Sequence, residues 1–446
     1  MKCKDVKYSY RKIWMIAYPI LISTLIEQLI GMTDTAFLGR VSEVTLGASA
    51  LAGVYYMVLF MIGLGFSIGV QIIIGRRNGE GNYHLAGVTF WHGMYFILGL
   101  GVAITLLSEL LSPMAMQLMV SSTQIREAAM DYVRWRVIGL IFGYSAAMFR
   151  AFYIGTTQTK ALTVNSVVML LSNVLFNWVL IFGHWGVSAM GIKGAAIGST
   201  LAGVVSFVVF VVYMRLCIDR TRYGLNRLPK LSMHIMKLVL RISSWTMVQN
   251  FISISTWFVF FLFVEHTGER SLAVSNIVRS ISGLVWMILI AFASTGSTLV
   301  SNLIGYGNND GVIALTRKVL KFTYMVILPL LVVISLMPEP FIMIYTDIAE
   351  LVPASVPSLW VLCASYLLSI PAIVYFQAVS GTGNAKSAFA LELVALFVYV
   401  LYCFVVIELM RSDVAVCWTA EAVYAAVMVI MCRVYLWSGH WRGKMI

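Results

Sequence analysis

Apolar stretches long enough to cross a membrane recur along the whole chain of 446 residues. A helix of about 20 residues crosses the roughly 30 Å hydrocarbon core of a bilayer, and the pattern predicts twelve such helices. The expected ranges are 13–39, 46–75, 84–112, 127–153, 159–183, 191–216, 238–264, 271–304, 315–337, 355–380, 386–408 and 414–437. Because lipid satisfies no backbone hydrogen bonds, the predicted fold class is an all-α membrane protein.

The composition agrees with a chain embedded in lipid. Hydrophobic residues make up 60% of the sequence and charged residues 11%, against about 25% charged residues in an average soluble domain. Most of the 31 Lys and Arg residues fall in the connections on one side of the predicted spans, which the positive-inside rule places in the cytoplasm together with both termini. We therefore expect the net charge of +12 to face lipid headgroups and not nucleic acid.

An internal repeat with an offset of 226 residues divides the chain into two sets of six spans. Because each half has an even number of spans, the two copies share one orientation in the membrane. We expect two pseudo-symmetric six-helix bundles around a central cleft, formed by residues 1–216 and 238–446 and joined by a basic cytoplasmic linker, 217–237. The matching residues are Gly79, Gly81, Asn82, Gly155, Thr156 and Lys160 in the first half, and Gly305, Gly307, Asn308, Gly381, Thr382 and Lys386 in the second.

The first span carries two acids, Glu27 and Asp34. An ionised acid near the bilayer centre costs on the order of 3 kcal/mol, so neither is expected to face lipid. Their spacing of seven residues places both on one face of a helix. Two nearby carboxylates oppose joint ionisation, so the pair could bind a proton, with a purely structural pair as the alternative. Pro19 is expected to bend the start of this helix.

The fifth span carries Asn173 and Asn177, which share one helix face. Their amides could supply oxygens to an ion, or they could simply join neighbouring helices. The position that matches Asp34 in the second half is Phe260. This chemical asymmetry predicts that the ion site lies in the N-terminal half.

Enzyme chemistry has little support in the sequence. The stretch from Gly65 to Gly69 satisfies the GxSxG pattern of hydrolases, but it lies inside an apolar span where a strand and a helix should flank it. We interpret these glycines as a small-residue face for helix packing. The sequence has no phosphate-binding loop, no convincing nucleophile–base pair and no metal-ligand pattern, so we expect a protein that is not an enzyme and has no cofactor or resident metal.

Taken together, these motifs resemble the multidrug and toxic compound extrusion (MATE) exporters, most of all the bacterial DinF-like branch. The likeness covers nearly the whole chain. It includes Pro19 with the following run Asp34-Thr-Ala-Phe-Leu-Gly-Arg40, the glycine-rich ends of spans two and eight, the paired asparagines of span five and the run Gly191-Ile-Lys-Gly-Ala-Ala. The resemblance implies alternating access, with export of organic compounds driven by inward flow of H+ or Na+.

The resemblance also implies a coupling site, formed by Asp34, Tyr132, Asn173, Asn177 and Ser199. Two residues depart from the pattern of this branch, since Asn177 stands where aspartate is frequent and Glu27 stands where glutamine is usual. We expect Glu27 to act as the partner of Asp34 and protons to be the coupling ion. Sodium, held by Asp34, Asn173 and Asn177, remains the alternative.

The expected protein is thus a monomeric, multi-pass antiporter of the bacterial inner membrane that exports amphipathic, often cationic compounds. One alternative is a flippase for lipid-linked oligosaccharide or another lipid precursor, which would need a strongly basic cavity. Intramembrane cations are few, chiefly Arg134, Arg136, Arg150 and Arg279. A membrane-embedded enzyme is a more distant alternative.

Overall fold

The computed structural model describes residues 8–120, 122–346 and 348–442, and these residues form helices without any strand. Twelve helices in them are long and apolar enough to span a membrane, which confirms the predicted all-α membrane fold. The first six are α1 (Tyr10–Gly39), α2 (Glu43–Gly79), α3 (Tyr83–Met119), α4 (Thr123–Gly155), α5 (Lys160–Phe182) and α6 (Gly191–Cys217).

The second six spans follow a longer connection after α6. They are α7 (Met233–Glu265), α8 (Glu269–Gly305), α9 (Gly311–Leu336), α11 (Leu351–Gly381), α12 (Ala385–Cys403) with the π-helical turn Phe404–Leu409, and α13 (Val414–Cys417) continued by α14 (Thr419–Ser438). A short helix, α10 (Pro338–Met343), lies in the connection between α9 and α11. The third span runs beyond its expected end at residue 112, because Pro113 lies inside the helix without ending it.

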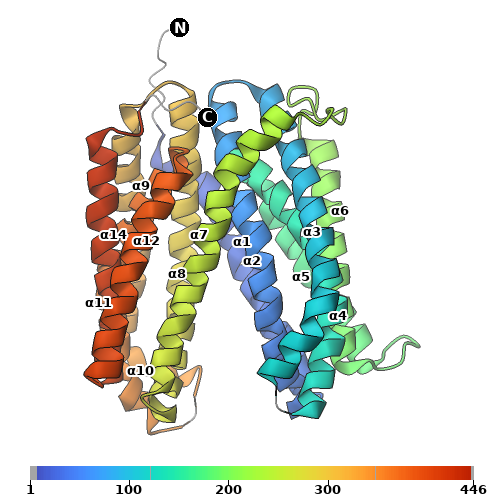
Figure 1. The fold of residues 1–446 in the computed structure, drawn as a ribbon, viewed down its shortest axis with the longest axis vertical. Helices are drawn as coiled ribbons and strands as arrows, with labels where there is room; N and C mark the ends of the chain where they lie inside the picture. Colours follow the sequence, from blue (N-terminus) through green and yellow to red (C-terminus); the bar gives the residue numbers. More distant parts are fainter. Residues whose placement is uncertain (1–7, 121, 347, 443–446) are drawn as a thin grey trace. The chain divides into compact units, whose positions relative to one another are not determined.

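The chain packs as two compact units, and two helices belong to both of them. The N-terminal unit is Tyr18–Met247, and the C-terminal unit is the chain up to Ala17 together with Val248–Ile446. The unit boundaries therefore fall inside α1 and α7 (Figure 1). The division into 1–216, 217–237 and 238–446 stays a prediction.

Within the N-terminal unit, α4 packs against α2, α3 and α6, and α5 packs against α6. Glycines allow the close approaches. A Cβ atom on Gly65 would lie 2.9 Å from the carbonyl oxygen of Thr246, and one on Gly69 would lie 2.5 Å from Cα of Ser243. The Thr246 hydroxyl also donates a 2.7 Å hydrogen bond to the carbonyl of Gly65. These contacts confirm that the GxSxG stretch is a helix-packing face.

In the C-terminal unit, α11 packs against α8, α9 and α14, and α12 packs against α14. The internal repeat is visible in equivalent close contacts between helices in the two units. A Cβ atom on Gly155 would lie 3.0 Å from the carbonyl oxygen of Gln71, and one on Gly381 would lie 2.4 Å from that of Ser297. Both the glycines and their neighbours are related by the offset of 226 residues. The repeat is therefore structural as well as sequential.

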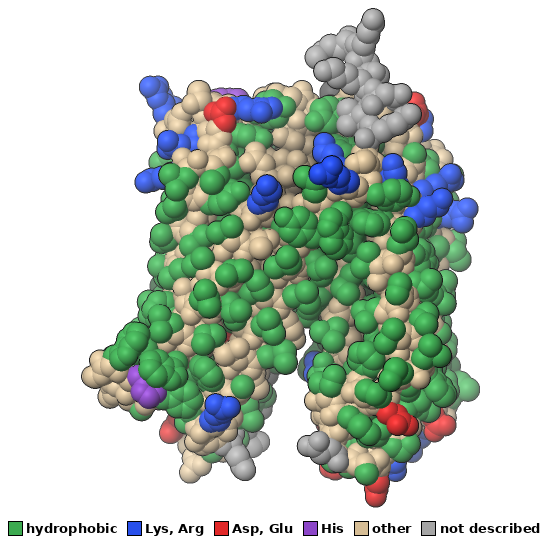
Figure 2. Space-filling view, turned by 180° about the vertical axis from the view of Figure 1, so that it is seen from behind, with side chains coloured by type: hydrophobic (Ala, Val, Ile, Leu, Met, Phe, Trp, Pro, Cys, Tyr) green, Lys and Arg blue, Asp and Glu red, His purple; other side chains and the backbone are tan. Residues whose placement is uncertain are grey.

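The surface of each unit agrees with a membrane environment. Hydrophobic side chains cover the middle of the helices, whereas Lys and Arg side chains gather mainly toward one end (Figure 2). Fully or largely exposed apolar side chains include Leu110, Leu171 and Phe397. Lys2, Lys4, Lys7 and Lys444, which the positive-inside rule also places on the cytoplasmic side, lie outside the described residues.

Candidate ion-coupling site

Four of the predicted site residues form one hydrogen-bonded cluster in the N-terminal unit. The Asn177 amide donates to Oδ1 of Asp34 at 2.5 Å, and the Ser199 hydroxyl donates to Oδ2 of Asp34 at 3.1 Å. Asn173 donates to the Ser199 hydroxyl oxygen at 3.2 Å and accepts from Asn177 at 3.2 Å. The cluster therefore joins α1, α5 and α6 through the carboxylate of Asp34.

The helices hold this cluster away from solvent. Exposed fractions are 1% for Asn173, 0% for Asn177 and 3% for Ser199, whereas Asp34 is partly buried. Close packing of α5 and α6 brings the side chains together, since a Cβ atom on Gly198 would lie 2.4 Å from Oδ1 of Asn177. The same Oδ1 atom has no hydrogen-bond partner among the described residues. The site is therefore a partly buried acid with neutral donors on both carboxylate oxygens.

A fixed positive charge completes the site. Arg136 of α4 interacts electrostatically with Asp34 and forms a hydrogen bond with Tyr132, one turn earlier on the same helix. Its guanidinium lies 4.1 Å from the ring centroid of Tyr56 on α2. Tyr132 is buried and also interacts electrostatically with Asp34. The predicted Tyr132 is thus linked to the cluster by Arg136, which interacts with both Tyr132 and Asp34 and was not predicted as a site residue.

Arg136 could have been found from its spacing. It stands four residues after Tyr132, so both side chains share one face of a helix. The sequence analysis counted Arg136 only among the few intramembrane cations. Its place beside Asp34 depends on how α4 packs against α2, α3 and α6, which spacing along one helix does not reveal.

Glu27 has a different partner from the expected one. Its carboxylate forms a salt bridge with Arg150 of α4 and accepts a hydrogen bond from Ser23 at 3.3 Å. Ser166 of α5 in turn donates to Ser23 at 2.7 Å. The sequence analysis paired Glu27 with Asp34, but each of these acids instead has its own arginine on α4. The reason is that the long side chains of α4 reach across to α1 at two levels.

Pro19 lies inside α1, in the first turn that belongs to the N-terminal unit. It has no N–H to donate to the carbonyl one turn earlier, so the helix is weakened at this position. The structure therefore places the predicted bending residue on the same helix as Asp34, about four turns away.

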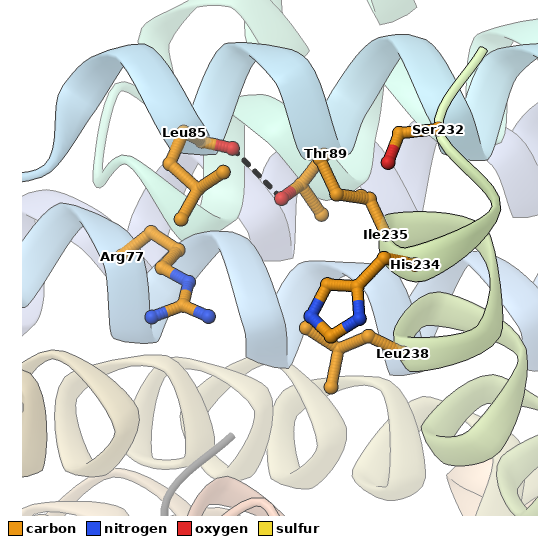
Figure 3. Close-up of a pocket in the computed structure, with 7 residues that line it drawn as sticks. All are labelled: Arg77, Leu85, Thr89, Ser232, His234, Ile235 and Leu238. Carbon is orange, nitrogen blue, oxygen red and sulfur yellow. Dashed lines mark hydrogen bonds between the residues drawn. The ribbon is translucent and has the colours of Figure 1, made fainter.

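A separate cavity of about 300 Å³ lies where the long connection after α6 enters α7. It is lined by Arg77, Leu85, Thr89, Ser232, His234, Ile235 and Leu238, and none of the predicted coupling residues belongs to it (Figure 3). Arg77 forms a 2.8 Å ion pair with Glu80, and the Thr89 hydroxyl donates to the carbonyl of Leu85. Two of the polar side chains that line this cavity, Arg77 and Thr89, are thus engaged within the protein.

The described residues form no cluster of side chains typical of a metal site. They contain no group of three or more His, Cys, Asp or Glu side chains that could hold a metal ion. Oxygen atoms near Asp34 come instead from amides and a hydroxyl. Such a set suits a proton or an alkali cation better than a transition metal.

Comparison with known proteins gives consistent matches. A family model described as MatE matches residues 19–179 and 246–405. The chain is 22% identical to the probable multidrug resistance protein NorM of Thermotoga maritima, in an alignment covering 99% of this chain and 95% of that protein. It is also 22% identical to the probable multidrug resistance protein YoeA of Bacillus subtilis, covering 98% of this chain and 95% of that protein.

Solved structures show the same fold at low sequence identity. A multidrug resistance MATE family transporter in an outward-facing conformation matches with a TM-score of 0.89, at 17% identity and 97% coverage of both chains. A transporter from Pyrococcus furiosus, described as a member of the MOP superfamily, matches with a TM-score of 0.86, at 18% identity and 96% coverage of both chains.

Proposed function

Because this chain belongs to the MatE family of multidrug efflux transporters, we propose that it is a secondary active antiporter that exports amphipathic, often cationic organic compounds in exchange for protons. Family membership places it among transporters and not among enzymes. The observation that supports the proposed coupling is the buried carboxylate of Asp34, held by Asn177, Ser199 and the charge of Arg136.

Proton binding would rearrange this cluster. The ionised Asp34 accepts from Asn177 and Ser199 and attracts Arg136. A proton removes the negative charge and turns one acceptor oxygen into a donor, so the attraction to Arg136 is lost and one hydrogen bond must reverse or break. Because the cluster joins helices α1, α4, α5 and α6, protonation changes which helix arrangement is favoured. Uptake outside and release inside would then drive alternating access.

The arrangement favours protons over sodium. Sodium needs several oxygens around one point, and those available are on Asp34, Asn173 and Asn177. The amide nitrogen of Asn177 faces Asp34, and Arg136 adds a positive charge beside it. Like charges repel, so a second cation at this carboxylate is disfavoured, whereas a proton bonds directly to it.

The relatives support a bacterial location and a drug-like cargo. The named bacterial proteins NorM and YoeA are described as probable multidrug resistance proteins. We propose that this chain works as a monomer in the bacterial inner membrane, among lipids, with both termini in the cytoplasm. The side with most Lys and Arg residues is then the cytoplasmic one.

Transport by purified protein in liposomes tests the coupling site. With ethidium as the cationic probe, Asp34→Asn should abolish export driven by an imposed proton gradient, because the side chain can no longer alternate between two charge states. Asp131→Asn, an exposed acid on α4, is the matched control and should export normally. Normal export by Asp34→Asn would show that the site is wrong. Export driven by a sodium gradient at fixed pH, with the proton gradient collapsed, would show that the ion is wrong.

A further inference from the structure

The C-terminal unit contains a buried carboxyl group without a basic partner. Glu392 of α12 is only 5% exposed, and Glu421 of α14 lies on the helix packed against it. Neither acid takes part in any ion pair of the described part of the chain. An ionised carboxylate buried without a cation is strongly unfavourable, so this environment favours a neutral, protonated acid.

Side chains from three helices surround Glu392. Gln249 and Ser253, one turn apart on α7, contact it from one side, and Tyr424 of α14 contacts it from another. Tyr424 interacts electrostatically with both acids, and Tyr399 donates a 3.1 Å hydrogen bond to Glu421. The titratable groups that face the two acids are all neutral or acidic, namely Tyr366, Tyr399, Tyr424, Cys403 and Cys432.

Two acceptor oxygens compete for the single hydroxyl proton of Ser253. The Ser253 hydroxyl has a single proton but lies 2.5 Å from Oε1 of Glu392 and 2.8 Å from the carbonyl oxygen of Gln249. In addition, Oε2 of Glu392 and the side-chain oxygen of Gln249, a residue only 8% exposed, are buried without a hydrogen-bond partner among the described residues. A proton on Glu392 would let the acid donate to the side-chain oxygen of Gln249 or to the hydroxyl of Ser253, which could then donate to the backbone carbonyl of Gln249.

We propose that Glu392 is a second proton-binding site, in the C-terminal unit, with Ser253 and Gln249 as the groups that hold the proton. It differs from the site at Asp34 in its electrostatics. Asp34 has an arginine beside it and a donor on each carboxylate oxygen, whereas Glu392 has no cation beside it among the described residues and one carboxylate oxygen buried without a hydrogen-bond partner.

Infrared difference spectroscopy tests proton binding without transport. The full-length protein in lipid is compared between acidic and alkaline pH, and the wild type should show a protonated-carboxyl C=O band that disappears on the alkaline side. Glu392→Gln should remove this band, and Glu339→Gln, an exposed acid of the same unit, should keep it. Identical bands in wild type and Glu392→Gln would overturn the proposal.

A second variant covers the case in which Glu392→Gln does not fold. Ser253→Ala keeps the acid but removes the hydroxyl 2.5 Å from it. Weaker hydrogen bonding should move the C=O band to higher frequency, and an unmoved band would contradict the assigned partners.

The use of this proton in transport rests on the proposed function. The proton site at Glu392 and the proposed coupling at Asp34 can be rejected separately. If both sites are coupled, Glu392→Gln should lower the number of protons moved per ethidium exported, while Asp34→Asn abolishes export. Normal export by Asp34→Asn together with a Glu392 band would leave the proton site standing and reject the proposed coupling site. Loss of export in Asp34→Asn with no Glu392 band would do the reverse.

Discussion

Gly198 sets how closely α6 approaches the amides that hold Asp34. The position has no room for a side chain, because a Cβ atom would lie 2.4 Å from Oδ1 and 3.3 Å from the backbone nitrogen of Asn177. Gly99 on α3 is a useful contrast, since nothing lies within 4 Å of the same point there. The same added methyl group would therefore disturb the Asp34 cluster at position 198 and would meet open space at position 99.

We predict that Gly198→Ala displaces Asn177 and weakens its hydrogen bond to Asp34. Overpacking of this kind typically destabilises a protein by about 1–3 kcal/mol. Thermal unfolding of the purified protein should therefore begin at a lower temperature, and export in liposomes should fall, whereas Gly99→Ala should change neither. Equal stability and export in both variants would mean that α6 can shift without affecting the site.

The individual site residues were predictable to different degrees. Asp34, Asn173 and Asn177 stand out in the sequence because polar groups inside apolar spans need partners. The partner of Glu27 did not follow from the sequence, because spacing along one helix gives no information on which residue of another helix faces it. The cluster around Glu392 was not predicted from the sequence for the same reason. Glu392 and Gln249 lie within the predicted spans 386–408 and 238–264, but only packing brings α7, α12 and α14 together.

At the scale of elements, the connection between α6 and α7 is held against α3 and not free. The backbone N–H of Ser232 donates to Nε2 of His92 at 2.9 Å, and Tyr95 donates to the carbonyl of Pro229 at 3.1 Å. Gly87 permits a still closer contact, because a Cβ atom there would lie 1.8 Å from the carbonyl oxygen of Tyr223. The segment expected to be a linker is thus packed on the N-terminal unit.

Gly87→Ala should detach part of this connection from α3. The added methyl group cannot coexist with the backbone of Tyr223, so the segment around Arg220 and Arg222 should move outward and become more accessible. Limited trypsin digestion in detergent measures this as faster cleavage after these arginines. Gly99→Ala, on the same helix, provides the control. Unchanged cleavage in Gly87→Ala would show that the connection is held by its other contacts alone.

The spans themselves were the most predictable elements. Each of the twelve expected ranges falls on a helix, because a long apolar run has no other stable conformation in lipid. Their ends were harder to predict, as the helical Pro113 and the short helix α10 show. Helix ends depend on caps and on neighbouring helices at the membrane surface, where hydropathy gives little guidance.

At the scale of the whole molecule, the proposed orientation makes one end of the spans cytoplasmic. Cys217, at the end of α6, provides a natural reporter of this orientation because it is exposed. The other cysteines of the described residues, Cys363, Cys403, Cys417 and Cys432, are buried. Cys3 lies outside the described residues, so a Cys217→Ser variant is needed to assign any labelling.

A membrane-impermeant maleimide should label Cys217 in inverted membrane vesicles and not in right-side-out vesicles. The reason is that the basic segment after α6 is expected to remain in the cytoplasm. Glu350→Cys in the Cys217→Ser background, placed in the connection before α11, should show the opposite pattern. Labelling of Cys217 in right-side-out vesicles would invert the proposed topology.

The division of α1 between the two units has a mechanical consequence. Ala17 belongs to one unit and Tyr18 to the other, and Pro19 follows at once. The proposed alternating access would bend the backbone of α1 here and that of α7 near Met247, and at this point Pro19 leaves the carbonyl of Met15 without its usual helical donor. Asp34 lies on the same helix, in the part that belongs to the N-terminal unit. Asp34 and Pro19 thus belong to one continuous helix, which would connect a change at the acid with bending at the proline.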